Sequence, residues 1–178
     1  SQFRYDLIWD KQLTTGFLNS NRQPLRRHEQ IAVFYKKQPT YNPQITHGHC
    51  RKISKSDFIK ESNGDSCYGR EVRKTSYDST DRYPIDVQTF SSGSQQGKIH
   101  PTQKPVSLCE YMILTYTNNG DLVLDSCAGS CTTGVACHNT GRNFIGFEKD
   151  KSIYERGLNR YKEETEQLNI FDLQNIRT

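Results

Sequence analysis

The segment 121–148 constrains the fold of this chain more than any other part of its sequence. It reads as an apolar strand ending at Asp125, a turn of small residues, a helix, and a second apolar strand ending at Glu148. The turn, residues 126–133, holds Gly129 and several hydroxyls, so the backbone can approach a ligand while the next helix offers unused N–H groups. Glu148 lies 23 residues after Asp125, about where dinucleotide folds place the acid that binds a ribose diol. The segment therefore predicts an α/β fold with a site for a nucleoside cofactor.

Length and composition limit the class of protein. A chain of 178 residues has room for one domain with a real core, and no apolar run approaches the roughly 20 residues that would span a bilayer. The chain starts at Ser1, and its only methionine is Met112. No basic and then apolar leader precedes the first strand. We therefore expect a cytoplasmic protein without membrane insertion or disulfides, whose natural start lies upstream.

The net charge of +4 is unevenly distributed. Residues 1–99 carry 16 basic and 10 acidic side chains, whereas residues 100–178 carry eight basic and ten acidic ones. The functional interpretation of this excess of basic side chains is that the first hundred residues bind a polyanion. A mildly basic, solvated surface is the alternative.

The six cysteines do not predict a metal site. They form no C-x2-C pair, and His138 next to Cys137 does not supply one, so the spacing of tetrahedral zinc ligands is absent. Reduced thiols, several of them packed as small apolar residues, account for the cysteines better.

The chain divides into three segments, 1–35, 36–99 and 100–178, which differ in their hydrophobic patterns. Residues 1–35 contain two β-branched and aromatic runs, 6–9 and 31–35, which we expect to form strands joined by a long loop. Residues 36–99 are poor in aliphatic side chains and predict an irregular insertion, in which 85–90 is a short candidate strand.

The third segment, residues 100–178, returns to a regular pattern. Pro105 stands at a first helical position, and apolar residues recur at helical spacing until Asn119 and Gly120 end the helix. The strand, turn, helix and strand described above follow. Asp150 then caps a last helix with one apolar face. We expect this segment to be the cofactor-binding half of the domain.

Four stretches in this order resemble one enzyme family. They are YDLIWDK at 5–11, RRHEQIAVFYK at 26–36, HPTQKP at 100–105 and VLDSCAGSCTTGVACHNTGRNFIGFEKD at 123–150. Their sequences and order are similar to the permuted β group of the S-adenosylmethionine-dependent DNA amino-methyltransferases, which methylate the exocyclic amine of adenine or cytosine. The resemblance covers nearly the whole chain except the insertion. It implies a Rossmann-like sheet with helices on both faces.

The resemblance implies a site for S-adenosylmethionine, and the chemistry of the residues agrees. Glu148 can accept both ribose hydroxyls, Asp125 can hold the ammonium, and the N–H groups and hydroxyls of the turn can meet the carboxylate. In the family, HPTQKP closes over the same end of the cofactor. The expected cofactor-binding residues are Thr102, Lys104, Asp125, Ser126, Ala128, Gly129, Ser130, Thr132, Thr133 and Glu148. The alternative is that Asp125 caps the next helix and Glu148 is merely exposed.

Two residues depart from the family's loop, which usually reads Asp-Pro-Phe-x-Gly-Ser-Gly-Thr-Thr. Ser126 stands in place of the proline, and Cys131 stands in place of the second glycine. If position 131 needs a positive φ, a cysteine there costs on the order of 1 kcal/mol, which weakens binding several-fold.

The family's reactive motif is Asp, Asn or Ser followed by Pro-Pro and an aromatic residue, and this sequence lacks it because its six prolines are never adjacent. We therefore expect no catalytic residue among these 178. In the permuted order the motif would lie upstream of Ser1, with one or two strands that belong between those of 1–35 and those of 121–148. Such an incomplete parallel sheet should fold poorly alone or need a complementing upstream segment.

Contact with double-stranded DNA is expected from the first hundred residues. The candidates for phosphate or base-edge contact are Asn21, Arg22, Arg26, Arg27 and His28, with solvated loop charges as the alternative. The insertion at 36–99 occupies the family's target-recognition region.

We interpret the sequence as part of a bacterial or phage DNA methyltransferase of the restriction-modification type, with adenine N6 as the favoured target. Cytosine N4 stays open, because the residue that best separates the two belongs to the absent motif. A non-catalytic remnant that binds DNA or cofactor is the alternative from another class, and a nicotinamide oxidoreductase is a third. The sequence indicates neither the recognition sequence nor the oligomeric state.

Overall fold

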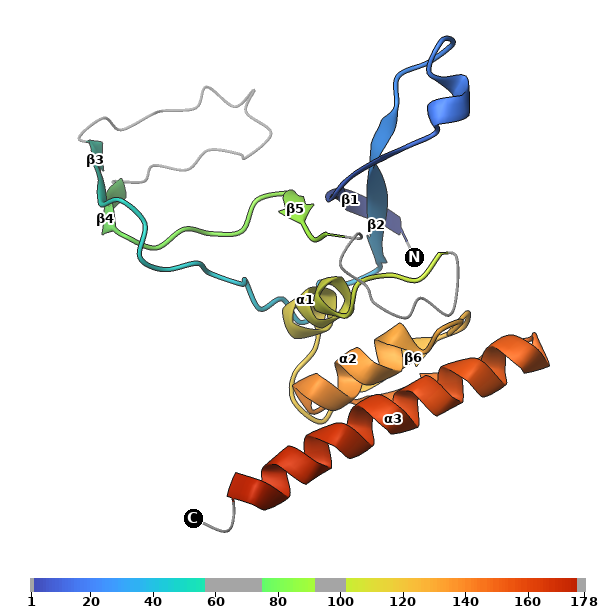
Figure 1. Cartoon of the computed structure of the whole chain (residues 1–178). Helices are drawn as coiled ribbons and strands as arrows, with labels where there is room; N and C mark the ends of the chain where they lie inside the picture. Colours follow the sequence, from blue (N-terminus) through green and yellow to red (C-terminus); the bar gives the residue numbers. More distant parts are fainter. Residues whose placement is uncertain (1, 57–74, 92–101, 176–178) are drawn as a thin grey trace. The chain divides into compact units, whose positions relative to one another are not determined.

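The computed structural model describes residues 2–56, 75–91 and 102–175, which fold into two separate units. One unit contains the chain up to Asn42 and from Ile85 onward, and the other is Pro43–Pro84. Figure 1 shows the helices and strands of each. The first unit contains all the candidate cofactor residues.

A long antiparallel hairpin begins the first unit. β1 (Gln2–Thr15) pairs with β2 (Arg26–Tyr35), which confirms the two strands expected there and extends both of them. Side chains alternate between the two faces of a strand, and on β1 one face buries Leu7, Trp9 and Lys11. The hairpin thus contributes an aromatic ring and an ammonium group to the interior.

Two short elements complete the hairpin and its sheet. β5 (Val87–Thr89) lies within the candidate strand at 85–90 and pairs in parallel with the middle of β1, giving the order β2-β1-β5. The indole N–H of Trp9 donates to the carbonyl of Phe90 at 2.7 Å, which fixes the end of β5. In the hairpin turn, η1 (Phe17–Asn19) forms a single 3-10 turn.

The rest of the first unit follows the order expected from the sequence. Its elements are α1 (Val106–Tyr116), β6 (Leu122–Asp125), α2 (Thr132–Thr140), β7 (Asn143–Gly146) and α3 (Lys151–Asn175). β6 and β7 pair in parallel and are connected by α2, which lies between α1 and α3 (Figure 1). This alternation of strand and helix is the expected α/β architecture.

The helix ends follow local signals in the sequence. α1 begins one residue later than expected, because Pro105 has an extended ψ of 138° and precedes the helix instead of opening it. Gly141 follows α2 with a φ of 71°, in the left-handed region that ends many helices. Asp150 caps α3 as expected, since its Oδ1 accepts the N–H of Ile153 at 2.9 Å.

One face of the β6–β7 pair packs against the helices. The buried core there is Ile113, Ala136 and Cys137, with Val106, Cys109, Val123 and Phe144 packed against it. Burial raises the pKa of the Cys109 and Cys137 thiols to about 11, so both behave as packed apolar groups.

The other face of the β6–β7 pair is exposed. Its apolar side chains are Leu122, Leu124, Ile145 and Phe147. An exposed apolar face of this kind has room for a further packed layer.

The second unit is a small hairpin within the segment 36–99. β3 (Lys52–Ser56) pairs antiparallel with β4 (Thr75–Ser79), and residues 57–74 between them lie outside the described residues. Arg51 donates two hydrogen bonds to Asp78, at 2.6 and 2.7 Å, and so ties the two strands together.

Among the described residues, no helix is long and apolar enough to cross a membrane. The same residues contain no group of three or more His, Cys, Asp or Glu side chains that could hold a metal ion. The five cysteines described there are free thiols.

Candidate functional site

The turn between β6 and α2 bends through two residues with a left-handed backbone. Gly129 has a φ of 51°, and Cys131, just before α2, has a φ of 57° and a ψ of 27°. Position 131 therefore has the positive φ that the family's glycine suggested, and the Cβ of Cys131 strains the backbone there. Ser126, at the start of the turn, is exposed. The N–H of Ala128 donates to the carbonyl of Phe147 at 2.8 Å, so the turn is bonded to the end of β7.

Asp125 is the last residue of β6, and both of its oxygens are bonded within the turn. Oδ1 accepts the N–H of Cys127 at 2.9 Å, and Oδ2 accepts the hydroxyl proton of Thr133 at 2.7 Å. The carboxylate therefore braces the turn against the first residues of α2. A carboxylate has about four acceptor positions, so this bracing leaves room for a further donor.

Glu148 joins the end of β7 to the same turn. Its Oε2 accepts the N–H of Gly129 and its Oε1 accepts the N–H of Asp150, each at 3.0 Å. The N–H groups of Asp150 and then Gly129 lower the pKa of Glu148, so the side chain is ionised at neutral pH. Glu148 is thus a fixed anion with unused lone pairs, not merely an exposed side chain.

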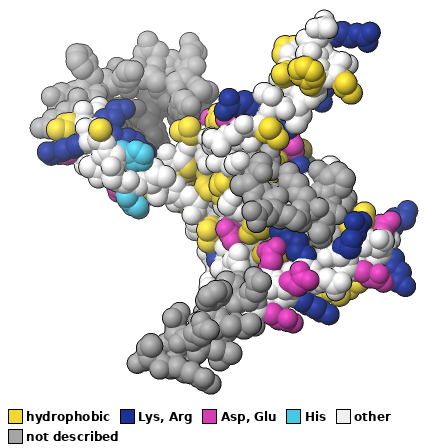
Figure 2. All heavy atoms as spheres, viewed as in Figure 1, with side chains coloured by type: hydrophobic (Ala, Val, Ile, Leu, Met, Phe, Trp, Pro, Cys, Tyr) yellow, Lys and Arg dark blue, Asp and Glu magenta, His cyan; other side chains and the backbone are white. Residues whose placement is uncertain are grey.

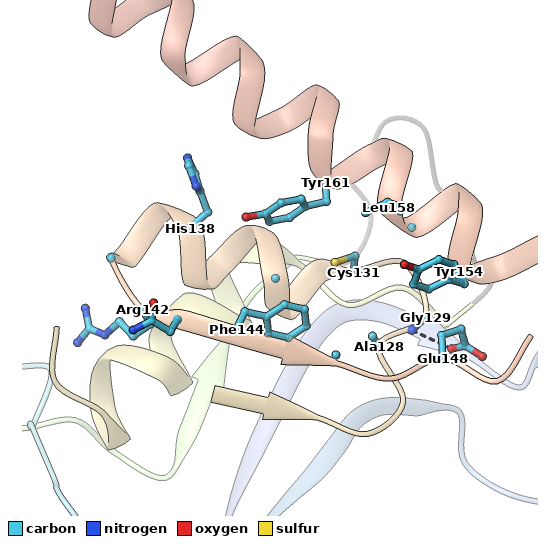
Figure 3. A pocket seen from close by; sticks show the side chains of 15 residues that line it. Ala128, Gly129, Cys131, His138, Arg142, Phe144, Glu148, Tyr154, Leu158 and Tyr161 are labelled. Atoms are coloured by element: carbon cyan, nitrogen blue, oxygen red, sulfur yellow. Dashed lines mark hydrogen bonds between the residues drawn. The ribbon is translucent and has the colours of Figure 1, made fainter. Parts of the chain in front are cut away.

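A crevice of about 520 Å³ runs beneath α3, within the size range of small-molecule sites. Figure 3 shows Gly129, Glu148 and Tyr154 at one end, and His138 and Arg142 at the other. Between them the crevice is lined by Phe144, Leu158 and Tyr161. Ala128, Gly129 and Glu148 are therefore the expected site residues that face this crevice.

The hydroxyls of Ser130 and Thr132 are used inside the fold. Both residues are buried, and their hydroxyl oxygens lie 3.0 Å apart. Arg160 of α3 donates to the carbonyl of Ser130 and to the hydroxyl of Thr132, both at 2.9 Å, and also pairs with Glu164 at 2.6 Å. Sequence reasoning missed Arg160, because a charged residue on a long polar helix carries no local signal.

Gly157 is a second residue that the sequence reasoning missed. A Cβ at this position would lie 2.5 Å from the carbonyl oxygen of Gly129 and 3.5 Å from the nitrogen of Cys131. Only a glycine therefore lets α3 lie this close to the turn. An isolated glycine inside a helical pattern was the available signal.

Lys104 contacts the β1–β2 hairpin. Its Nζ lies 2.7 Å from Oε2 of Glu29 and 5.3 Å from the centre of the Trp9 ring, while Lys11 lies 3.4 Å from Oε1 of the same carboxylate. Burial alone would raise the pKa of Glu29, but the hydrogen bond and charge of Lys104, helped by Lys11, lower it. Thr102 is exposed, and the preceding residues 92–101 lie outside the described residues.

A second cavity, of about 460 Å³, connects Lys104 with the turn. Its walls include Trp9, Lys104, Met112, Val123 and Thr133. Lys104 and Thr133, which the sequence predicts at one ligand, therefore line the same cavity. The turn has this cavity at Thr133 and the crevice at Gly129.

The candidate DNA-binding residues are all exposed on the hairpin, but they differ in their partners. Arg27 forms two hydrogen bonds to Asp10, at 2.8 and 3.0 Å, which raise the pKa of Arg27 and lower that of Asp10. In the part of the chain that the structure describes, Arg22 and Arg26 have no ion pair, and Asn21 and His28 lie beside them. Arg27 thus links the two strands of the hairpin through Asp10, whereas no ion pair among the described residues compensates the charges of Arg22 and Arg26.

Comparison with known proteins gives one family. A family model described as DNA methylase matches residues 1–159. The type II methyltransferase M2.MboI of Moraxella bovis is 45% identical over 82 residues, which are 46% of this chain and 30% of that protein. The DNA adenine methyltransferase YhdJ of Escherichia coli is 49% identical over 61 residues, 34% of this chain and 21% of that protein. The matches therefore span less than a third of either relative.

Solved structures agree on the fold. The M1.HpyAVI–SAM complex is 27% identical with a TM-score of 0.56, over 89% of this chain and 61% of that chain. The cytosine-N4-specific PvuII DNA methyltransferase is 18% identical with a TM-score of 0.57, over 92% of this chain and 55% of that chain. Both likenesses support the Rossmann-like methyltransferase architecture.

Proposed function

Because this chain belongs to the DNA methylase family, whose model matches residues 1–159, we propose that it is the cofactor-binding part of a DNA methyltransferase. The whole enzyme would move a methyl group from S-adenosylmethionine to an exocyclic amine of a DNA base. Adenine N6 is the favoured acceptor, since YhdJ, a relative similar over 61 residues, is named an adenine methyltransferase. Cytosine N4 is the alternative acceptor.

The observation that carries this proposal is the pairing of Glu148 with Gly129 at the mouth of the crevice. A ribose diol needs an ionised acceptor held at a fixed angle, and the N–H groups of Gly129 and Asp150 hold Glu148 in that state. An adenine ring packs against apolar surface, which the ring of Tyr154 and the side chain of Leu158 on α3 provide nearby (Figure 3). These residues therefore fit the adenosine part of S-adenosylmethionine.

The amino-acid part of the cofactor would be held on the Asp125 side of the turn. Asp125 supplies the charge for the ammonium, and the first N–H groups of α2 supply donors for the carboxylate. Lys104 and Thr102 would close over this end from the second cavity, which Lys104 lines together with Thr133. When bound, the cofactor supplies an electrophilic methyl group on its sulfonium.

The acceptor side of the reaction would come from a segment outside these 178 residues. An exocyclic amine is a poor nucleophile, and two acceptors for its N–H bonds together with an aromatic platform favour attack. No Pro-Pro-aromatic run in this sequence provides them. We propose that a complementing segment supplies this motif and a strand that pairs with the edge of β6.

Double-stranded DNA would meet the hairpin and the second unit, which share the basic excess of the chain. The segment 36–99 would then serve as the target-recognition part. Because both DNA and S-adenosylmethionine are cytoplasmic in bacteria, we place the enzyme in the cytoplasm of a bacterial or phage-infected cell, as part of a modification system.

Titration of the chain with S-adenosylmethionine tests the cofactor assignment. The Glu148→Gln variant should bind about tenfold more weakly, because it loses a charge-assisted acceptor. Glu155→Gln removes the same charge from an exposed position on α3 and should leave the affinity unchanged. Equal binding by Glu148→Gln and the parent, or a preference for a nicotinamide dinucleotide, would refute the assignment.

A non-catalytic remnant is the second candidate, and the strained backbone at Cys131 favours it. The coding DNA upstream of Ser1 distinguishes the two, since an enzyme requires an in-frame Pro-Pro-aromatic motif there. The chain extended by that segment should transfer labelled methyl groups to unmethylated DNA. A folded, extended chain that binds the cofactor without transfer would establish the remnant.

A further inference from the structure

The turn of the β1–β2 hairpin presents two large apolar side chains to solvent. Phe17 is 78% exposed and Leu18 is 99% exposed, the highest values among the large apolar residues described. The turn itself is ordered by its own backbone, since the N–H groups of Asn19 and Ser20 donate to Gly16 and Phe17 at 2.9 and 3.0 Å. These apolar groups are therefore held outward by a bonded turn.

The charge around this turn has one sign. The sequence contains no acidic residue between Lys11 and His28. Where the regular strand pairing ends next to the turn, Arg27 forms an ion pair with Asp10. Arg22 and Arg26 have no ion pair in the described ranges of the chain. Figure 2 shows hydrophobic and basic side chains together at this far end of the hairpin.

The hairpin is built so that the turn departs from the regular strand pairing. Between the pairs Asp10↔His28 and Thr15↔Arg26 the register shifts, and Gln12 takes a left-handed φ of 57°. The carboxylate of Asp10 accepts the N–H of Gln12 at 3.0 Å as well as both bonds from Arg27. One carboxylate thus fixes the bulge from which the turn projects.

We propose that the hairpin turn is an apolar wedge for duplex DNA: Phe17 and Leu18 enter between base pairs while Arg22 and Arg26 bind the flanking phosphates. This inference rests on the proposed function, because a base must leave the duplex before its amine can react. Apolar side chains inserted at a base step lower the cost of unstacking, and basic neighbours hold the opened backbone. A surface that is apolar at its tip and exclusively basic around it matches this polyanion better than an apolar protein groove.

Two double variants separate the two contributions. A short duplex of mixed sequence, labelled with a fluorophore, is titrated with each protein at several salt concentrations. Phe17→Ser with Leu18→Ser should weaken binding about tenfold without changing the salt dependence. Arg22→Gln with Arg26→Gln should weaken binding and reduce the slope of log affinity against log salt by about two. Ile145→Ser, at an exposed apolar position on β7 and outside the proposed DNA contacts, is the control and should bind as the parent does.

Phe17→Trp gives a direct view of insertion. Trp9 is the only tryptophan of the chain and is buried, so a new indole at position 17 would dominate the exposed fluorescence. Stacking on bases should quench this emission when duplex is added and protect it from a soluble quencher. Unchanged emission at saturating duplex, or parental affinity of the Phe17→Ser, Leu18→Ser variant, would overturn the wedge alone. Failure of the parent to bind any duplex, when circular dichroism shows it to be folded, would overturn the proposed function as well.

Discussion

Replacing Gly157 by alanine tests whether α3 is seated on the turn as described. The added Cβ would lie 2.5 Å from the carbonyl oxygen of Gly129, and 3.5 Å from backbone atoms of Ser130 and Cys131. All of these are backbone atoms of a bonded turn, so no side-chain rotation relieves the overlap. Either α3 must move away or the turn must change shape.

Two opposing effects set the expected magnitude. In an exposed helix interior, alanine is more favourable than glycine by about 1 kcal/mol. Overpacking of a well-filled contact costs about 1–3 kcal/mol, and the overlap here is severe enough for the upper value, about 3 kcal/mol. The net expectation is that the variant Gly157→Ala loses about 2 kcal/mol of unfolding free energy. The sign is thus opposite to that of an ordinary glycine-to-alanine change in a helix.

Urea unfolding followed by circular dichroism measures this change. Asn159→Ala, at an exposed position of the same helix, is the matched control and should gain a few tenths of a kcal/mol from helix propensity. Because Gly129 and Gly157 line one crevice, Gly157→Ala should also weaken S-adenosylmethionine binding, whereas Asn159→Ala should not. If Gly157→Ala were as stabilising as Asn159→Ala, α3 would not contact the turn and the reasoning would be refuted.

Three further changes test the bracing of the turn and the hairpin. Cys131→Gly should be more stable to urea than Cys131→Ala by about 1 kcal/mol, because only alanine keeps a Cβ at a left-handed φ; equal stability would mean that no strain is stored there. Arg160→Leu should lose about 2 kcal/mol by leaving buried acceptors unpaired, whereas the exposed control Arg156→Leu should change stability by less than about 0.5 kcal/mol. Glu29→Gln should cost about 1 kcal/mol at neutral pH. The pKa of Glu29 is lowered in the fold, so the contribution of Glu29 to stability is complete above the ordinary pKa of 4.5 and is lost as the pH falls below that value. A stability difference between Glu29→Gln and the parent that persists at about pH 3 would contradict this.

The segment around the turn was predictable because its signals are local. A strand that ends in an acid, a glycine at a positive φ after the preceding helix and an N-cap aspartate each act within a few residues. Asp125, Gly120 and Asp150 take these roles in the structure. The strain at Cys131 was predictable for the same reason, since the sequence alone shows a cysteine where the family has a glycine.

The contacts between distant segments were not predictable in the same way. Lys104 pairs with Glu29, 75 positions away, and Arg160 reaches back 30 positions to the turn. Neither pair has a periodic spacing or a motif that links its members. The sequence predicts Lys104 at the cofactor, but no pattern in it indicates that the same ammonium also contacts the Glu29 carboxylate and the Trp9 ring.

The bonds inside the turn also change which groups are left for a ligand. Ser130 and Thr132 bond to each other and to α3, and the hydroxyl of Thr133 donates to a carboxylate. These hydroxyls, which the sequence predicts at the cofactor, also hold the turn in shape, so their loss should lower stability. What faces the crevice is the small surface of Gly129 and the oriented anion of Glu148. In the proposed site, recognition of the adenosine part would depend on close backbone approach and one fixed carboxylate, and for this reason the packing of α3 on the turn should affect affinity.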